Sequence, residues 1–179
     1  PNAREPDGNI LSTIRQENRY EHATGPRSRS GGQWDIWEAV FSPVGPDGFP
    51  ATIWDPQTGE IDHEVAEHWR ENYDLHHYLR EHWSTVGPKL RGKIHIATGN
   101  TDTYYLEEAV HLLEDFLETT DDPPAEASVE YGERQPHCWI GASRDQPGQP
   151  LTYAEFLDIA AHHLVERAPE GADGTSWWY

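Results

Sequence analysis

The sequence predicts an α/β fold, and three observations support it. The stretch KIHIAT at residues 93–98 places Ile94 and Ile96 on one side of a short strand. A helical pattern follows, and then ASVEYG at residues 127–132 forms a second strand. A last helix begins near Thr152. Because alternating strands and helices are typical of parallel pairing with right-handed crossovers, we expect the two strands to be neighbours in a parallel sheet.

Each helix of this unit carries its own signal. The first has apolar side chains at the spacing of a buried stripe, with glutamates on the opposite face. The stripe comprises Leu106, Ala109, Val110, Leu113, Phe116 and Leu117, and the glutamates are Glu107, Glu108, Glu114 and Glu118. Thr152 and Glu155 match a capping box, which opens a helix that runs to about Arg167. Residues 93–179 therefore predict a βαβα unit.

The first sixty residues predict a largely irregular segment. The turn-forming strings PDG, SGG, GPDGFP and DPQTG recur there, and we expect one early helix, around Ile10 to Tyr20. So long an irregular stretch is unusual unless it covers or builds a site. Its aromatic residues have two interpretations: a satellite core under the loops, which is favoured, or a wall that binds an acyl or aryl group. They are Trp34, Trp37, Phe41, Phe49 and Trp54.

Two helical pieces lead from this segment to the first strand. Asp62 is a candidate N-cap, and the helix after it has one apolar face. That face comprises Val65, Ala66, Trp69 and Tyr73. A second piece covers Leu75 to Trp83 and ends before the Gly-Pro pair at 87–88. We therefore expect residues 1–92 to form an irregular and helical lid-like segment, and residues 93–179 to form the βαβα part of one incomplete domain.

Charge and composition exclude several classes of partner. The chain has 13 basic and 32 acidic residues, a formal net charge of −19. Such a surface repels phosphate backbones and anionic lipids, so we expect neither nucleic acid nor membrane as a partner. No apolar run reaches the roughly 18 residues of a membrane span, and no signal peptide is evident. The chain has a single cysteine, Cys138, which excludes an internal disulfide. The cysteine content therefore does not indicate whether the protein works in an oxidising or a reducing compartment.

An acid and a histidine follow the two strands. Asp102 lies in the turn after residues 93–98, and His137 follows residues 127–132 in the string YGERQPHCW. In open parallel sheets catalytic groups gather beyond the carboxyl ends of the strands, so these two residues should lie side by side. An aspartate that accepts a hydrogen bond from one ring nitrogen leaves the other to take a proton from a nucleophile. The pair therefore predicts the acid and base of a nucleophile–acid–histidine triad.

Other roles for these residues stay open, and a nucleophile is not evident. Asp102 is also a candidate cap for the helix that starts near Tyr104, and His137 has an alternative as a structural histidine. The serine of such hydrolases lies on a G-x-S-x-G elbow before the acid. The nearest strings, GASRD at 141–145 and GTSWW at 174–178, lack the closing glycine and follow the histidine. Cys138 is a poor nucleophile, because sequence neighbours rarely face each other across a site.

Two parts of the sequence resemble a known group of enzymes. IHIATGNTDTYYLEEAVHLLEDFLE and YGERQPHCW resemble the C-terminal part of uncharacterised bacterial esterases of the α/β-hydrolase fold, related in pattern to enterochelin esterases and S-formylglutathione hydrolases. The strings STIRQENRYE, SRSGGQWDIWEAVFSPVGPDGFP and IWDPQTGEID resemble large members of the same group. The resemblance, from about residue 10 to about 167, implies that Asp102 is the triad acid and His137 the base.

The resemblance also implies partners. The serine elbow precedes this region in the resembling proteins, which implies that the chain is a C-terminal fragment, inactive when isolated, of a hydrolase that acts on a small ester. The N-terminal part of the hydrolase domain is then its partner, and an exposed sheet edge would favour self-association. No cofactor is implied. The alternatives are a non-catalytic binding module of the same fold and a metal-dependent hydrolase.

The metal alternative rests on the histidines and glutamates of residues 63–82. The string HEVAEH has one residue too many to match the HExxH pattern of zinc enzymes. Glu64 with His68, and His77 with Glu81, share i, i+4 spacing, but solvated helix faces explain these pairs more simply. We therefore expect no metal site here.

Overall fold

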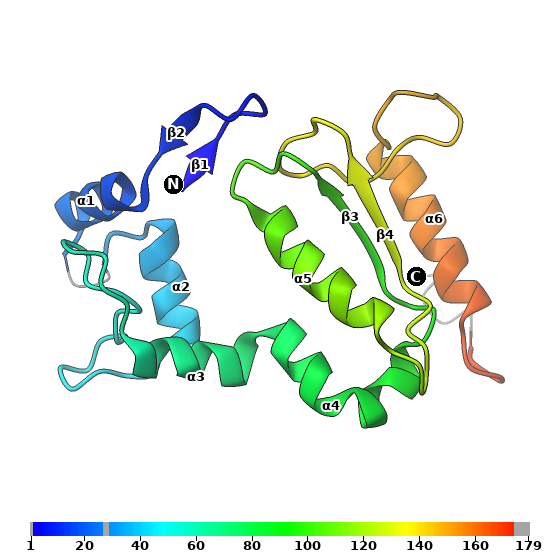
Figure 1. Cartoon of the computed structure of the whole chain (residues 1–179), viewed down its shortest axis with the longest axis horizontal. Coiled ribbons are helices and arrows are strands. Elements are labelled where there is room, and N and C mark those ends of the chain that lie inside the picture. Colours follow the sequence, from blue (N-terminus) through cyan, green and yellow to red (C-terminus); the bar gives the residue numbers. More distant parts are fainter. Residues whose placement is uncertain (1, 27–28, 174–179) are drawn as a thin grey trace.

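The computed structural model describes residues 2–26 and 29–173, which form a mixture of helices and strands (Figure 1). The elements are β1 (Ala3–Arg4), β2 (Ile10–Ser12), α1 (Ile14–Thr24), α2 (Gln33–Phe41), α3 (His63–Tyr73), α4 (Leu75–Leu90), β3 (His95–Gly99), α5 (Leu106–Glu118), β4 (Ser128–Gly132) and α6 (Tyr153–Glu166). The predicted α/β class is confirmed at this level. The larger sheet of a complete hydrolase is not present in the described residues.

The predicted pair of parallel strands is present. β3 and β4 pair in parallel, with Ile96 opposite Val129, one to two residues later at each start than the sequence predicts. α5 packs against β3 and lies along one side of the pair, and α6 lies along the other side (Figure 1). The carboxyl ends of β3 and β4 therefore meet at one edge of the unit.

The hydrophobic core lies between α4, α5 and the segment before β4. Its buried members are Trp83, Leu117 and Ala125. The Trp83 ring meets Phe116 edge-on at 5.6 Å, and its indole N–H donates to the carbonyl of Pro123 at 2.9 Å. Of the predicted stripe of α5, Leu113, Phe116 and Leu117 face this core. Leu106 and Ala109 are exposed, so the prediction of a continuous buried stripe is wrong for the first turn of the helix.

Two helix starts occur where their capping residues predict them. Asp62 accepts hydrogen bonds from the backbone N–H groups of Glu64 and Val65, at 3.0 and 3.2 Å, so α3 begins at the next residue. Thr152 and Glu155 form both bonds of a capping box at the start of α6. These local signals work because each one satisfies N–H groups that the first helical turn leaves free.

The predicted helix from Ile10 to Tyr20 is wrong at its start. Residues 10–12 form strand β2, which pairs antiparallel with β1 across a turn at Gly8, where φ is 90°. α1 begins only after the capping box of Thr13 and Gln16. The capping pair of Thr13 and Gln16 therefore marks a helix start about one turn later than the predicted one.

The prediction of a single helix in residues 1–60 is also wrong, because α2 lies there as well, although more than half of the described residues in this stretch lie outside the named helices and strands. Trp34, Trp37 and Phe41 are spaced i, i+3, i+7, which is the period of a helix face. Glycine-rich turns on both sides conceal this short pattern. The favoured interpretation of the aromatic residues fits the structure, since the Trp34 ring meets Trp37 and Trp54 edge-on at 4.9 and 4.7 Å.

The predicted end of the second helical piece near Trp83 is wrong as well. α4 continues to Leu90 with Pro88 inside it. A proline there removes only one backbone donor close to the end of the helix. Gly87 lies against the Trp83 ring, where an added Cβ would come within 2.7 Å of it. The glycine therefore serves packing rather than helix termination.

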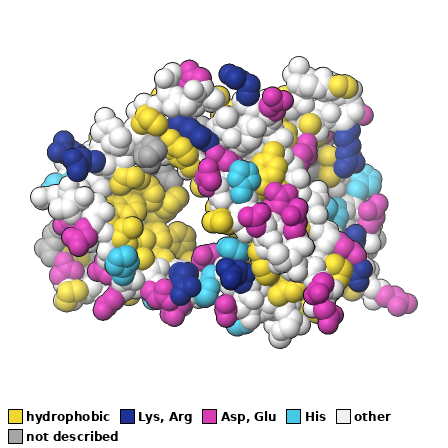
Figure 2. Space-filling view, in the orientation of Figure 1, with side chains coloured by type: hydrophobic (Ala, Val, Ile, Leu, Met, Phe, Trp, Pro, Cys, Tyr) yellow, Lys and Arg dark blue, Asp and Glu magenta, His cyan; other side chains and the backbone are white. Residues whose placement is uncertain are grey.

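The chain is arranged as two parts with two links between them. β1, β2, α1 and α2 lie on the left of Figure 1, β3 to α6 lie on the right, and α3 with α4 connects them below. Above, the N–H of Arg4 in β1 donates to the carbonyl of Thr103 at 2.9 Å. Figure 2 shows an opening between the two parts and hydrophobic side chains gathered on the left part.

Candidate active site

Asp102 is buried in the turn between β3 and α5, with 3% of its surface exposed. Its Oδ1 atom accepts hydrogen bonds from the backbone N–H groups of Tyr104 at 2.8 Å and Leu106 at 3.4 Å. Tyr105 has a left-handed backbone, with φ of 63°, which turns the chain into α5. Tyr105 occupies the N-cap position of α5 and makes no side-chain hydrogen bond there, so Asp102 is not the N-cap residue. One oxygen of its carboxylate instead closes the turn before α5 and supports the helix start from three residues upstream, through the N–H of Leu106, and this is the capping role meant below.

The loop that carries His137 is hydrogen-bonded to the turn that carries Asp102. Thr101 donates from its hydroxyl to the carbonyl of Gln135 at 3.0 Å, and Arg134 donates its N–H to the side chain of Asn100 at 2.7 Å. Gly99 leaves room for this approach, because a Cβ there would meet the Gln135 carbonyl oxygen at 2.0 Å. These hydrogen bonds join the two loops at the carboxyl ends of β3 and β4.

His137 Nδ1 lies 2.9 Å from Asp102 Oδ2. The predicted juxtaposition of the two residues is therefore confirmed, whereas their catalytic role stays a prediction. A carboxylate can only accept, so a neutral His137 carries its proton on Nδ1 and leaves the lone pair on Nε2. The Tyr104 ring meets the imidazole edge-on at 5.0 Å, and 39% of the His137 side chain is exposed. This arrangement can hold a proton acceptor in a fixed orientation.

A buried ion pair supports the Asp102 turn from the N-terminal side. Arg4 donates from Nε to the backbone carbonyl of Asp102 at 3.2 Å and forms an ion pair with Glu107. Its guanidinium also lies 4.3 Å from the centre of the Tyr105 ring. One side chain from β1 thus contacts the backbone before Tyr105, the Tyr105 ring and the first turn of α5.

The sequence pattern predicts Glu107 on the solvated face of its helix, and this prediction is wrong. Only 3% of Glu107 is exposed, and its second carboxylate oxygen has no hydrogen-bond partner among the described residues. The helix pattern gives no sign of this burial, because the partner, Arg4, lies 103 residues away in the chain. Sequence reasoning therefore missed both members of the pair.

No nucleophile reaches His137 in the described part of the chain. Neither a hydroxyl nor a thiol among residues 2–26 and 29–173 forms a hydrogen bond with its ring. Ser143, in the string GASRD, is buried and donates to Glu155 at 2.6 Å, in the capping box of α6. That hydrogen bond is the largest cause of the lowered pKa of Glu155. Cys138 is exposed, and GTSWW at 174–178 lies outside the described residues.

The histidine-rich helices α3 and α4 do not assemble a metal centre in the described residues. No group of three or more His, Cys, Asp or Glu side chains is positioned there to hold an ion. Glu67 pairs with Arg70 instead, and this bond lowers the pKa of Glu67. Tyr78 packs against His82 at 4.6 Å between ring centres. The metal alternative gains no support from this geometry.

Comparison with models of known protein families, with curated proteins and with solved structures finds no match for this chain. These comparisons therefore do not test the esterase resemblance, which stays a prediction from the sequence strings. Among the helices of the described residues, none has both the length and the apolar character needed to span a bilayer.

Proposed function

We propose that this chain is the C-terminal part of a serine esterase of the α/β-hydrolase type, and that Asp102 and His137 are its triad acid and base. The supporting observation is the 2.9 Å contact between Asp102 Oδ2 and His137 Nδ1 at the carboxyl ends of two parallel strands. This is the edge at which open parallel sheets place their catalytic groups.

The reaction assigns one task to each residue. A serine from polypeptide outside residues 1–179 attacks the carbonyl carbon of a small ester, and His137 Nε2 takes the proton from its hydroxyl. The protonated imidazole then gives this proton to the departing alkoxide, which leaves as the alcohol. Water, activated by the same nitrogen, releases the acyl group as a carboxylic acid. Asp102 orients the ring and stabilises its positive charge.

The open surfaces of the βαβα unit support a partner from the rest of such a domain. Each strand of the β3–β4 pair has only one neighbour among the described strands, and parallel sheets are normally covered on both faces. All residues of α6 are described and none is buried. Its large exposed apolar side chains are Tyr153, Phe156, Leu157, Leu164 and Val165. Further strands of a hydrolase sheet would cover these surfaces, and a second copy of the chain would compete for them.

A non-catalytic module of the same fold is the second candidate. It is favoured by the lack of a nucleophile at the His137 ring in the described residues and by the capping role of Asp102. In such a module the pair would stabilise the joined loops and would transfer no proton.

Hydrolysis of p-nitrophenyl acetate and labelling by a fluorophosphonate distinguish the candidates. The isolated chain should hydrolyse the ester no faster than a His137→Ala variant, and the probe should label none of its serines. A longer protein that contains these residues after a G-x-S-x-G elbow should be labelled at the elbow serine. In that protein His137→Ala should abolish turnover without unfolding, whereas His63→Ala, at an exposed residue that begins α3, should be silent. Full activity of His137→Ala would contradict the esterase proposal.

A further inference from the structure

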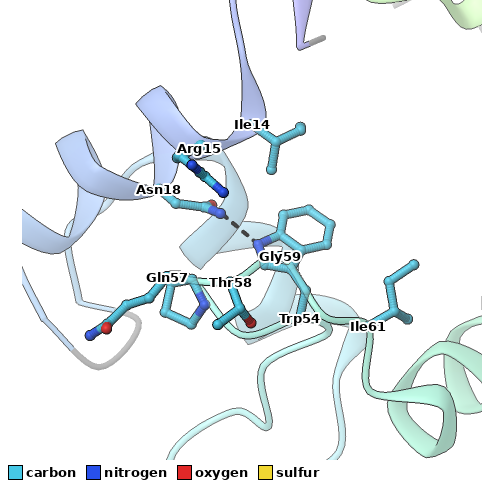
Figure 3. A pocket seen from close by; sticks show the side chains of 9 residues that line it. Ile14, Arg15, Asn18, Trp54, Gln57, Thr58, Gly59 and Ile61 are labelled. Atoms are coloured by element: carbon cyan, nitrogen blue, oxygen red, sulfur yellow. Dashed lines mark hydrogen bonds between the residues drawn. The ribbon is translucent and has the colours of Figure 1, made fainter.

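A groove in the N-terminal part lies away from the two loops that carry Asp102 and His137. It consists of two cavities, of ≈330 and ≈430 Å³, which share Asn18, Pro56 and Gln57. We call it the α1 groove, because α1 forms one wall and the turn before α3 forms the other (Figure 3). Nothing in the proposed esterase reaction uses it.

One part of the α1 groove is apolar and held in place. Its apolar lining residues are Ile14, Trp54, Pro56 and Ile61. The Trp54 indole N–H donates to Asn18 Oδ1 at 3.2 Å (Figure 3), and the opposite contact is the edge-on packing with Trp34. Because both contacts fix the indole, it offers a flat wall against which an apolar or aromatic group can pack.

The side chains that α1 contributes to the groove include several hydrogen-bond donors. Asn18 is 7% exposed and lines both cavities, yet its amide nitrogen donates to none of the described residues. Arg15 and Arg19 stand one turn apart on α1, so they share a face, and neither forms an ion pair with a described residue. His22 lies nearly one further turn along. These groups together offer positive charge and free N–H bonds.

No acidic side chain is among the described residues that line the α1 groove, although the chain carries a net charge of −19. Several acids adjoin lining residues in the sequence without lining either cavity, namely Glu17, Glu21, Asp55, Glu60 and Asp62. Glu21 and Asp62 accept hydrogen bonds from backbone N–H groups elsewhere. Asp55 Oδ1 accepts from the N–H groups of Thr58 and Gln57, at 2.7 and 2.8 Å. These bonds lower the pKa of Asp55 and hold its charge within the turn. The groove is therefore suited to an anion on a protein whose surface otherwise repels anions.

We propose that the α1 groove binds a small amphipathic carboxylate. Its apolar or aromatic body packs against Trp54 and Ile61, and its carboxylate accepts hydrogen bonds from the Asn18 amide and from Arg15 or Arg19. Guanidinium groups suit this task because their paired N–H bonds match the two oxygens of a carboxylate. The site does not depend on the esterase proposal.

The test uses three probes, 4-phenylbutyrate, 1-naphthoate and octanoate, with 4-phenylbutan-1-ol as the uncharged match of the first. Each is titrated at low ionic strength into the ¹⁵N-labelled chain, and the Trp54 indole and Asn18 amide signals are followed by NMR. At least one carboxylate should shift both signals saturably, and 4-phenylbutyrate should bind about tenfold or more tightly than the alcohol. Higher salt should weaken the carboxylate only.

Two variants remove the charge recognition without emptying the groove. Arg15→Gln with Arg19→Gln should weaken carboxylate binding about tenfold, whereas Arg80→Gln, on the exposed surface of α4, should not. Asn18→Asp keeps the acceptor for Trp54 but replaces the free amide nitrogen by a negatively charged oxygen, so binding should be lost with the Trp54 signal in place.

Two results would overturn the proposal. One is the absence of a saturable shift with all three carboxylates up to about 10 mM, weaker than any useful affinity. The other is equal binding of the alcohol and the acid that is insensitive to Asn18→Asp.

Discussion

Replacing Asp102 tests whether one carboxylate both caps α5 and orients His137. Asp102→Ala removes the Oδ1 bonds to the N–H groups of Tyr104 and Leu106 and the Oδ2 bond to His137. Loss of a helix cap costs about 1 kcal/mol and loss of a second hydrogen bond about as much or more. The bond to Leu106 is long, and His137 is partly exposed to solvent, so we expect a total loss of about 2–3 kcal/mol in the free energy of unfolding.

Asp102→Asn separates the two roles. The amide oxygen must stay on the capping side, because otherwise the amide NH₂ would face the N–H of Tyr104. The cap is then kept, the loss of stability falls to about 1 kcal/mol, and an N–H group points at His137 Nδ1. The imidazole can no longer donate from Nδ1, so the neutral ring should move its proton to Nε2.

Two measurements check these expectations. Urea unfolding followed by circular dichroism gives the stabilities, with Asp121→Asn in an exposed loop as the control. Long-range ¹H–¹⁵N NMR at alkaline pH, where histidine is neutral, shows which ring nitrogen carries the proton. The reasoning is refuted if wild-type His137 carries its proton on Nε2, or if Asp102→Asn leaves it on Nδ1.

Three further predictions follow from contacts elsewhere in the structure. Arg4→Met leaves Glu107 buried without its partner and should cost about 2–3 kcal/mol in urea unfolding, since Arg4 is itself 19% exposed, whereas Arg80→Met should cost under about 0.5. Burial, followed by repulsion from His163, lowers the pKa of His95, so the unfolded chain binds this proton more readily. The stability from His95 is complete above its usual pKa of about 6.5 and is lost as the pH falls through the lowered value, so His95→Gln should flatten the acid limb of a stability profile. EDTA should leave the melting temperature unchanged, and a drop of several degrees would revive a metal site on α3 and α4.

The approach of Asp102 and His137 could be predicted because it follows from topology. Two parallel strands that are neighbours must end at the same edge, so residues a few positions beyond each end meet there. From the sequence alone, capping and catalysis are alternative roles for Asp102. A carboxylate has two oxygens, and the structure uses one for each contact, so the capping role does not count against the predicted pairing with His137.

What the sequence missed depends on contacts between distant residues or on short patterns among turns. The burial of Glu107 is set by Arg4, and no periodicity within the helix reveals a partner from the opposite end of the chain. The sequence does not predict α2, because its three aromatic positions span only two helical turns between glycine-rich strings, which is too short to show a clear period. Gly87 lies against the Trp83 ring inside α4, and a contact that forms only in the folded core cannot be distinguished in the sequence from a helix-ending glycine.

The two oxygens of the Asp102 carboxylate make different contacts, and this should affect which residue of the pair is lost first in evolution. An aspartate at this position is retained by selection for folding even in a lineage that has stopped hydrolysing esters, because α5 still needs its cap. The imidazole of His137 has no comparable second duty, since it is substantially exposed and its ring makes no other hydrogen bond to a described residue. Under the proposed esterase function, relatives that lose the activity should therefore lose the histidine first, and an aspartate before α5 without that histidine would mark a former enzyme.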